Sequence, residues 1–239
     1  MDTNIQKLQT LIDQASYIVF FGGAGVSTES GIPDFRSVDG LYNQKYKFPP
    51  ETIISRSFFE RMPEEFYRFY RDKLVVTGAR PNPAHRYLAH LERRGKLKAV
   101  ITQNIDGLHQ AAGSRNVLEL HGTLLENYCV KCGRRFDGDY ILNTEGIPRC
   151  SCGGMVRPDI VLYEESLDED VLSQSIHHLR KADLLSIGGT SLVVYPAASL
   201  IHYFRGAHLV LVNKSPTGAD ALAELTIAGS IGEVFSRLH

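Results

Sequence analysis

The sequence predicts an α/β protein in which a doubly wound parallel sheet carries a smaller lobe. Apolar runs of strand length alternate with amphipathic segments of helix length along most of the 239-residue chain. The alternation is interrupted twice, over residues 37–77 and 123–154, and these stretches are expected to be insertions that form the small lobe. The segments 1–36, 78–122 and 155–239 are therefore expected to make up the sheet domain.

The first helices and strands are expected in two pairs. Apolar residues recur at helical spacing near the start of the chain, at Ile5, Leu8, Ile12 and Ala15. The continuous apolar run 17–21 follows, which is typical of a strand buried on both faces of a parallel sheet. In the second pair, Asn82 followed by Pro83 indicates a helix start and Gly95 indicates its end. The run 97–101 then predicts the next strand.

Three further strands and one long helix complete the alternation. Short apolar runs at 117–120, 183–187 and 208–212 predict the strands. The helix is expected to begin near Asp168 and to end near Lys181, because acidic residues gather near its start and basic residues near its end. This order of elements is typical of a doubly wound sheet.

Composition limits the possible functions. A hydrophobic content of 43% supports a sizeable core, and a formal net charge of -1 provides no general basic field for a nucleic acid. The run 17–21 is too short to span a bilayer, and the first residues contain no apolar signal segment. We expect a cytoplasmic protein with neither a nucleic-acid nor a membrane partner. The sequence does not indicate an oligomeric state.

All four cysteines lie in the second insertion, at Cys129, Cys132, Cys150 and Cys152. Each close pair fits one turn, so four thiolates can meet around one tetrahedral ion. Four cysteine ligands leave no position open for water, and a structural zinc ion is therefore expected. Four free buried cysteines are the less favoured alternative, because unrelated cysteines would be scattered along the chain. The insertions thus predict a helical segment over 37–77 and a zinc-binding segment over 123–154, and metal-bound thiols fit a reducing compartment.

A glycine-rich loop at 22–27 follows the first strand. Bare backbone at such a turn can approach a pyrophosphate and offer its N–H groups, as in Rossmann-like sheets. However, Thr28 stands where a dehydrogenase would have its third glycine, and no acidic residue ends a second strand about twenty residues further on. A hydride-transfer enzyme is therefore disfavoured, and a simple tight turn remains possible for this loop alone.

Several further motifs accompany this loop in a fixed order. They are Gly31-Ile-Pro-Asp-Phe-Arg36, Thr102-Gln-Asn-Ile-Asp-Gly-Leu-His109, Ala112-Gly113, His121-Gly122, Gly189-Thr-Ser191 and Val212-Asn213. Together with the cysteine pairs, they resemble the sirtuins of bacterial type, which are NAD-dependent protein-lysine deacylases. The resemblance extends from the first strand to the C-terminus. Two positions depart from the family pattern, since Gly22 replaces a usual threonine and Glu164 replaces a usual glycine.

The resemblance implies that NAD lies across the carboxyl ends of the strands as a cosubstrate. The implied contacts are Ala24, Thr28, Phe35, Arg36, Gln103, Ile105, Asp106, His121, Thr190, Ser191, Asn213 and Ile231. Among these, Arg36 would supply charge for phosphate, and Phe35 would shield the reacting ribose carbon from water. Gln103 and Asn104 would hold the ribose and an ordered water, and Asp106 would accept a hydrogen bond from the nicotinamide carboxamide.

Catalysis is assigned, through the same resemblance, to His121 and Asn104. The acyl oxygen of a modified lysine attacks the ribose carbon as nicotinamide departs. His121 then takes a proton from a ribose hydroxyl, which attacks the resulting imidate. The expected products are nicotinamide, free lysine and O-acyl-ADP-ribose.

The segment 157–163 resembles the part of the family that binds acyl-lysine. Val161, Tyr163 and Val193 are the implied substrate contacts, and the peptide would add as a strand beside residues 164–165 and 193–194. Glu164 is expected to alter the preference for peptide sequence more than catalysis.

Acetyl and other neutral acyl groups are the expected substrates. Sirtuins that remove acidic acyl groups carry a Tyr-x-x-Arg pair, and here Tyr67 is followed by Tyr70 in place of the arginine. Two alternative functions remain. One is a mono-ADP-ribosyltransferase or NAD glycohydrolase that uses the same site, and the other is a zinc-ribbon interaction module without catalysis.

Overall fold

The computed structural model describes residues 3–35, 40 and 46–239. Its main sheet has six strands in the order β3-β2-β1-β7-β8-β9, and every pairing between neighbours is parallel. The strands are β1 (Ile18–Gly22), β2 (Leu97–Thr102), β3 (Val117–Glu119), β7 (Leu184–Gly188), β8 (His208–Asn213) and β9 (Leu225–Ala228). The order reverses between β1 and β7, which confirms the predicted doubly wound sheet.

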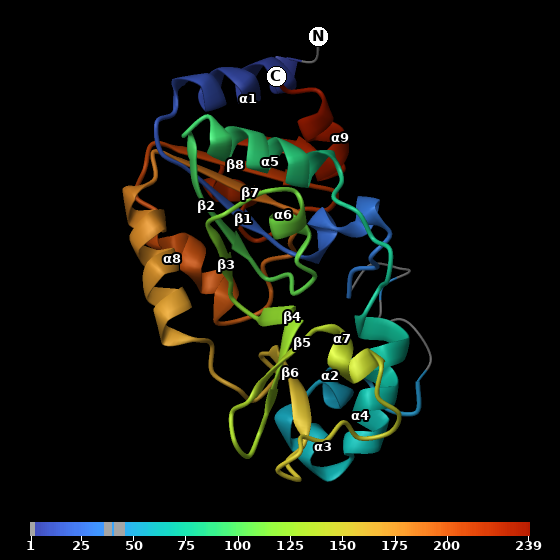
Figure 1. The fold of residues 1–239 in the computed structure, drawn as a ribbon. Helices are drawn as coiled ribbons and strands as arrows, with labels where there is room; N and C mark the ends of the chain where they lie inside the picture. The colour runs from blue at the N-terminus through green and yellow to red at the C-terminus, as the bar shows by residue number, and fades with distance from the viewer. Residues whose placement is uncertain (1–2, 36–39, 41–45) are drawn as a thin grey trace.

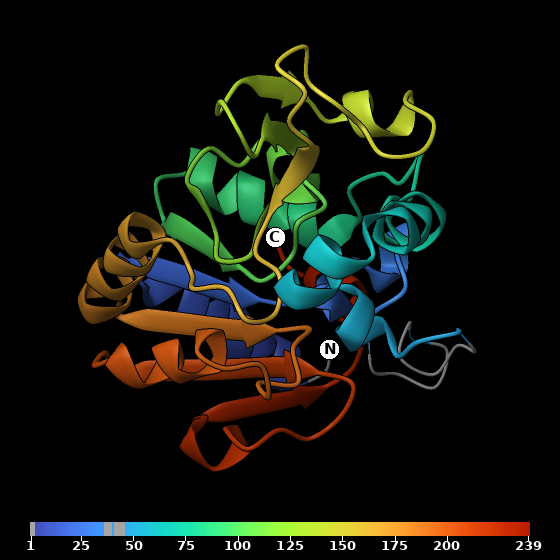
Figure 2. The same ribbon diagram turned by 90° about the horizontal axis from the view of Figure 1, so that it is seen from below.

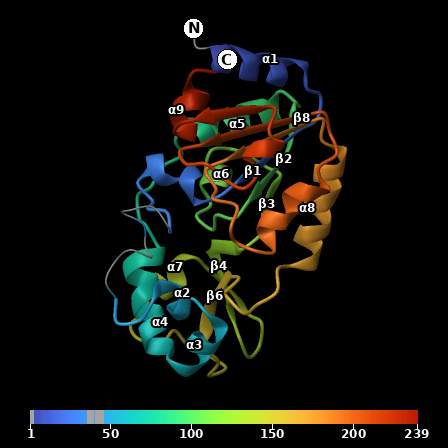
Figure 3. The same ribbon diagram turned by 180° about the vertical axis from the view of Figure 1, so that it is seen from behind.

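Helices cover both faces of this sheet (Figures 1 and 3). One face carries α1 (Thr3–Gln14), α5 (Pro83–Arg93) and α9 (Ile231–Ser236), and the other carries α8 (Glu169–Lys181) and the 3-10 segment η5 (Ala197–Tyr203). The predicted helix starts are confirmed by their caps. The Asn82 side chain accepts a hydrogen bond from the backbone N–H of Ala84, and Asp168 accepts one from Val171.

The last strand and helix, β9 and α9, were not predicted. Strand β9 has four residues with alternating burial, as expected for an edge strand that is solvated on one side. Helix α9 has six residues, too few to show a clear apolar period. Both elements nevertheless complete the core on the α1 and α5 face, through Ile227 and Phe235 among others.

The small lobe contains a three-stranded antiparallel sheet in the order β5-β4-β6. Its elements are β4 (Gly122–Cys129), β5 (Arg135–Asp137), α7 (Asp139–Leu142) and β6 (Val156–Ile160). The small sheet therefore runs past residue 154, where the sequence placed the end of the insertion, because β6 pairs with β4 instead of returning directly to the main sheet.

The helices of the first insertion lie beside this small sheet (Figures 1 and 2). They are α2 (Pro50–Ile53), α3 (Arg56–Arg61) and α4 (Pro63–Phe69), followed by a π-helical turn, η4 (Tyr70–Leu74). Their buried aromatic side chains share one core with Ile141 of α7 and Ile160 of β6. The Tyr67 hydroxyl donates a hydrogen bond to the Val156 carbonyl at 2.6 Å, so the two insertions pack as one unit.

Short segments occupy the remaining connections. They are the 3-10 turns η1 (Ala24–Val26), η2 (Thr28–Ser30) and η6 (Asp220–Leu222), and the one-turn helix α6 (Leu108–Ala111). Within the described ranges, no helix combines the length and the apolar character that crossing a bilayer requires.

Candidate functional site

A cavity of about 910 Å³ lies where the main sheet meets the small lobe. The loops that follow β1, β2, β7, β8 and β9 line it, and the segment after β6 closes it on the small-lobe side. The strand order reverses between β1 and β7, so the cavity occupies the crevice in which doubly wound sheets bind ligands.

The structure brings most of the predicted site residues to this cavity. Its lining includes Ala24, Thr28, Phe35, Gln103, Asn104, Ile105, Asp106, His121, Val161, Tyr163, Thr190, Ser191, Asn213 and Ile231. Val193 is not part of the lining, and its side chain is 54% exposed beside Val194, which does line the cavity. Arg36 lies outside the described residues.

The glycine-rich loop after β1 packs directly against the loop after β7. The backbone N–H of Gly25 donates a hydrogen bond to the Gly189 carbonyl at 2.8 Å. A Cβ atom at Gly25 would lie 2.8 Å from the Gly189 Cα, and one at Gly23 would lie 2.9 Å from the Thr190 Cβ. The absence of side chains at these two glycines makes room for the neighbouring loop. The predicted contact of this loop with a pyrophosphate remains a prediction.

The imidazole of His121 is oriented by the loop after β2. Its Nδ1 lies 3.1 Å from the backbone carbonyl oxygen of Gln103. Because that oxygen can only accept, Nδ1 carries the proton and Nε2 keeps a free lone pair. Burial lowers the pKa of His121 below its ordinary value of 6.5, and the bond to the Gln103 carbonyl acts weakly in the opposite direction. The ring is therefore neutral at pH 7 and can accept a proton.

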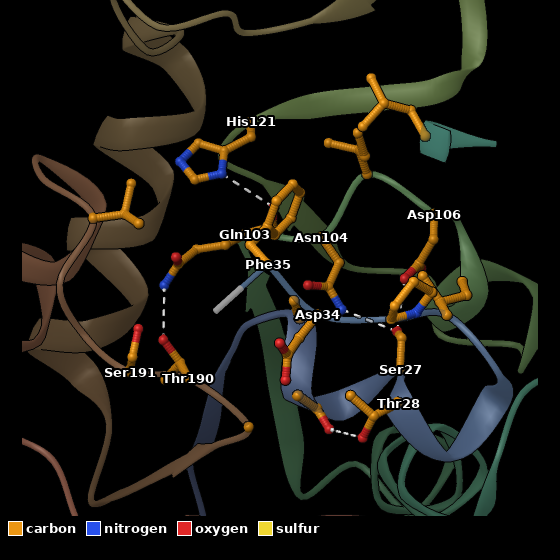
Figure 4. Close-up of a pocket in the computed structure, with 18 of the residues that line it drawn as sticks. Ser27, Thr28, Asp34, Phe35, Gln103, Asn104, Asp106, His121, Thr190 and Ser191 are labelled. Atoms are coloured by element: carbon orange, nitrogen blue, oxygen red, sulfur yellow. Dashed lines mark hydrogen bonds between the residues drawn. The ribbon is translucent and has the colours of Figure 1, made fainter. Parts of the chain in front are cut away.

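A second polar cluster lies away from His121 (Figure 4). The Ser27 hydroxyl donates to Asp106 Oδ2 at 2.6 Å and accepts from Asn104 Nδ2 at 3.1 Å. The backbone N–H of Leu108 donates to Asp106 Oδ1 at 2.9 Å, which fixes the carboxylate at the start of α6. Ser27 was not among the predicted site residues, and its place directly after the glycines of the first loop was the available signal.

A hydrogen bond between two side chains joins the two halves of the sheet across the cavity. Gln103 Nε2, after β2, donates to the Thr190 hydroxyl, after β7, at 3.2 Å (Figure 4). The rings of His121 and Phe35 lie near this pair in the same view. The cavity thus has an apolar, histidine-bearing part beside a polar part that contains a fixed carboxylate.

A buried ion pair shapes the segment after β6. The guanidinium of Arg157 donates to both carboxylate oxygens of Glu165, at 2.6 and 2.9 Å, and to the Ile160 carbonyl at 2.8 Å. Glu165 also accepts from the backbone N–H of Leu162 at 2.9 Å. Because both charges are largely removed from water and fully bonded, this pair defines the turn that presents Val161 and Tyr163 to the cavity.

The four cysteines meet at one point of the small lobe. Their sulfur atoms all lie within 4.8 Å of one another, with 3.5 Å between Cys129 and Cys152 and 3.8 Å between Cys132 and Cys150. A tetrahedral zinc ion with Zn–S bonds of about 2.3 Å requires sulfur atoms about 3.8 Å apart. The residues therefore fit a structural zinc ion. Gly154 is needed here, since a Cβ atom would lie 2.6 Å from the Cys129 sulfur.

Comparison with known proteins gives consistent results. The model of the Sir2 family matches residues 23–196. An NAD-dependent protein deacetylase from Clostridium perfringens is 59% identical over 242 residues, which cover 100% of this chain and 99% of that protein. The corresponding protein from Cutibacterium acnes is 53% identical over 236 residues, which cover 98% and 97%.

Solved structures resemble the whole chain. A Sir2 complex with a p53 peptide and NAD+ has a TM-score of 0.86 and 40% identity, and the match covers 98% of this chain and 96% of that one. A Sir2 complex with a deacetylated p53 peptide and 3'-O-acetyl ADP-ribose has a TM-score of 0.90 and 40% identity, with the same coverage of 98% and 96%.

We expect one zinc ion per chain and its loss in a Cys150→Ala variant. Without the metal, the zinc-binding insertion loses its cross-link, and the core that it shares with the helical insertion should loosen. Metal analysis and near-ultraviolet circular dichroism measure the two effects. Glu145→Gln is the matched control, because Glu145 is an exposed residue of the same insertion and its replacement should leave the zinc content unchanged. Fully folded protein that contains no zinc would contradict the assignment.

Proposed function

The chain belongs to the Sir2 family and is an NAD-dependent protein deacetylase, and we propose how its own residues bind the substrates and carry out the reaction. The family match covers residues 23–196, and relatives described as NAD-dependent protein deacetylases align with essentially the whole chain. The observation that carries the proposal is a neutral, oriented His121 in the same cavity as the Asp106 cluster.

NAD is proposed to lie along the carboxyl ends of the main-sheet strands. Ala24 and Thr28 would line its diphosphate, and Asn213, at the end of β8, and Ile231, after β9, would line the far end. Asp106 would accept a hydrogen bond from the nicotinamide carboxamide, because a carboxylate oxygen has lone pairs beyond those used by Ser27 and Leu108.

His121 is proposed as the general base. Its free Nε2 would take a proton from a ribose hydroxyl, and the Gln103 carbonyl would stabilise the resulting imidazolium through Nδ1–H. Gln103 and Asn104 would position the ribose and an ordered water. Phe35 would keep bulk water away from the ribose carbon, since its ring packs against the apolar core of the small lobe.

The acyl-lysine is proposed to enter from the small-lobe side. Val161 and Tyr163 line the cavity there with Ile105, and the peptide would lie between the segment after β6 and residues 193–194. Exposure of Val193 at the rim is compatible with contact to the peptide backbone rather than to the acyl group. The products would be nicotinamide, free lysine and O-acyl-ADP-ribose, in keeping with the acetyl ADP-ribose held by a related Sir2 protein.

The proposed partners are acyl-lysine side chains of proteins, and the proposed location is the cytoplasm. Four thiols that bind zinc persist as thiols in a reducing compartment. A formal net charge of -1 offers no general attraction for nucleic acid.

The function is tested by measuring nicotinamide release from NAD with and without an acetyl-lysine peptide. We expect release that depends on the peptide, and a fall of about 100-fold to 10,000-fold in turnover for His121→Ala, because a general base is lost. His177→Ala, an exposed histidine on α8, serves as the control and should keep full activity. Nicotinamide release without peptide would instead indicate an NAD glycohydrolase, and near-normal turnover of His121→Ala would remove His121 from catalysis.

The pH profile should show the state of His121. Its pKa lies below 6.5, so the neutral base persists at pH 7, and kcat/KM, which reports the free enzyme, should fall only as the pH drops through that lower pKa. Burial also raises the pKa of Glu119, at the end of β3, to about 7. The profile should therefore be repeated with Glu119→Gln, in which the acid limb is expected to remain. A midpoint above 6.5 in that variant would contradict a neutral His121.

Neutral acyl groups are the expected substrates, because the Tyr67 hydroxyl and the Arg71 guanidinium of the helical insertion are already engaged. The Tyr67 hydroxyl donates to Val156, and the Arg71 guanidinium donates to carbonyls of residues 141, 144 and 146. Lys73 does line the cavity, but Asp72 lies 3.3 Å from its Nζ and offsets its charge. Burying an unpaired carboxylate costs several kcal/mol, more than two methylenes return at about 0.8 kcal/mol each.

We therefore expect kcat/KM for a succinyl-lysine peptide to be at least about tenfold below that for the acetyl or butyryl form of the same peptide. A comparison of the three acyl groups on one peptide measures this. Equal values for succinyl and acetyl would overturn the prediction, and a selective loss of succinyl activity in Lys73→Ala would identify Lys73 as the responsible cation.

A further inference from the structure

Glu164 has an unusual backbone conformation. Its φ is +74°, in the left-handed region that glycine adopts freely and residues with a Cβ atom disfavour. Among the described residues, Leu192 at +53° is the only other non-glycine residue with a positive φ. A glutamate held in this conformation indicates that interactions of its side chain compensate for the strain.

The Glu164 side chain reaches the helical insertion. One carboxylate oxygen accepts a hydrogen bond from the backbone N–H of Ser57 at 2.9 Å, and the other accepts from the Ser57 hydroxyl at 2.9 Å. Ser57 is in the first turn of α3, where backbone N–H groups have no partner within the helix. The carboxylate therefore satisfies a helix N–H from a segment 107 positions away in the sequence.

The neighbouring backbone makes the same connection. Tyr163 and Ser55 form an isolated parallel bridge, in which the Arg56 N–H donates to the Tyr163 carbonyl and the Tyr163 N–H donates to the Ile54 carbonyl, both at 3.0 Å. These backbone bonds and the two Glu164 bonds form a clamp between residues 54–57 and 163–164. We refer to this set of contacts as the 54–57/163–164 clamp.

The clamp forms part of the cavity wall on the small-lobe side. Ile54, Tyr163 and Glu164 all line the cavity, and Tyr163 is 38% exposed there. On its other side, the segment is fixed by the Arg157–Glu165 ion pair. The position of the helical insertion relative to the acyl-lysine segment thus depends on contacts that Glu164 completes.

We propose that Glu164 is a positioning residue that holds the helical insertion against the acyl-lysine segment and thereby sets the peptide-binding wall. This proposal rests on the proposed function, because the proposed function places the peptide at this wall. It also replaces the sequence-based expectation for Glu164. Both carboxylate oxygens accept hydrogen bonds from Ser57, and the carboxylate is exposed to solvent that screens its charge. Its loss should therefore weaken the binding of all acyl-lysine peptides equally, whatever charges flank the lysine.

The test uses three variants of the full chain. Glu164→Gly removes the carboxylate while permitting the same backbone conformation, and Glu164→Gln keeps an oxygen that can accept from Ser57. Glu60→Gln is the matched control, because Glu60 is an exposed carboxylate on the same helix and pairs with Arg56. Each variant is assayed with two acetyl-lysine peptides, one with flanking lysines and one with flanking aspartates.

For Glu164→Gly, we expect KM for both peptides to rise by the same factor, about fivefold to thirtyfold, with kcat and the KM for NAD within about twofold of wild type. Glu164→Gln should stay within about threefold of wild type for both peptides, and Glu60→Gln should not differ from it. An unchanged peptide KM in Glu164→Gly would overturn the proposal, as would an equal rise in the KM for NAD. A variant effect that depends on the charge of the peptide would also overturn it, in favour of a direct electrostatic role.

Hydrogen exchange provides a readout that does not depend on activity. The Ser57 amide should exchange faster in Glu164→Gly than in wild type or Glu60→Gln, because it loses its acceptor. Unchanged protection would refute the clamp itself. Failure of the proposed function would look different, since the wild-type protein would then show no peptide-dependent use of NAD while the exchange result could still support the clamp.

Discussion

The close approach of two loops at the reversal of the strand order supports the whole site. Gly25 donates to the Gly189 carbonyl at 2.8 Å, and Gly189 has a φ of +59° with no room for a Cβ atom beside Val26. The loop after β1 is thereby anchored to the loop after β7, and together they form one wall of the crevice. The loop after β2 forms the opposite wall. The hydrogen bond between Gln103 and Thr190 spans the two walls. A larger residue at either glycine would push the loops after β1 and β7 apart and displace the side chains that they carry.

Long-range polar contacts then determine how precisely those groups are placed. His121 takes its orientation from the Gln103 carbonyl, and Asp106 takes its own from Ser27 and from the start of α6. On the proposed peptide side, Arg157 and Glu165 perform the equivalent role for the turn after β6. In each case the partners are already hydrogen-bonded to one another, so little reorganisation is needed when substrates arrive. The two non-glycine residues with positive φ in the described chain, Glu164 and Leu192, also lie on the segments proposed to flank the peptide.

The sequence could predict those parts of the fold that depend on local signals. The caps at Asn82 and Asp168, the buried run of the first strand and the spacing of the cysteines are all local, and the motif order identified the family. Other contacts join distant segments, and no pattern in a single sequence encodes them. They are the pairing of β6 with β4, the hydrogen bond from Tyr67 to Val156 and the 54–57/163–164 clamp. The role of Ser27 was missed because a serine after glycines is common in any tight turn.

The shared core of the two insertions links the metal to the substrate. Because the aromatic side chains of the helical insertion pack with α7 and β6, and the Tyr67 hydroxyl donates to Val156, the four-cysteine centre and the proposed acyl-lysine wall belong to one packed body. Thermodynamic reciprocity requires that if zinc favours the arrangement that binds peptide, then bound peptide must favour retention of zinc by the same free energy. Under that coupling, a higher concentration of acylated substrate would make the protein retain its zinc more firmly.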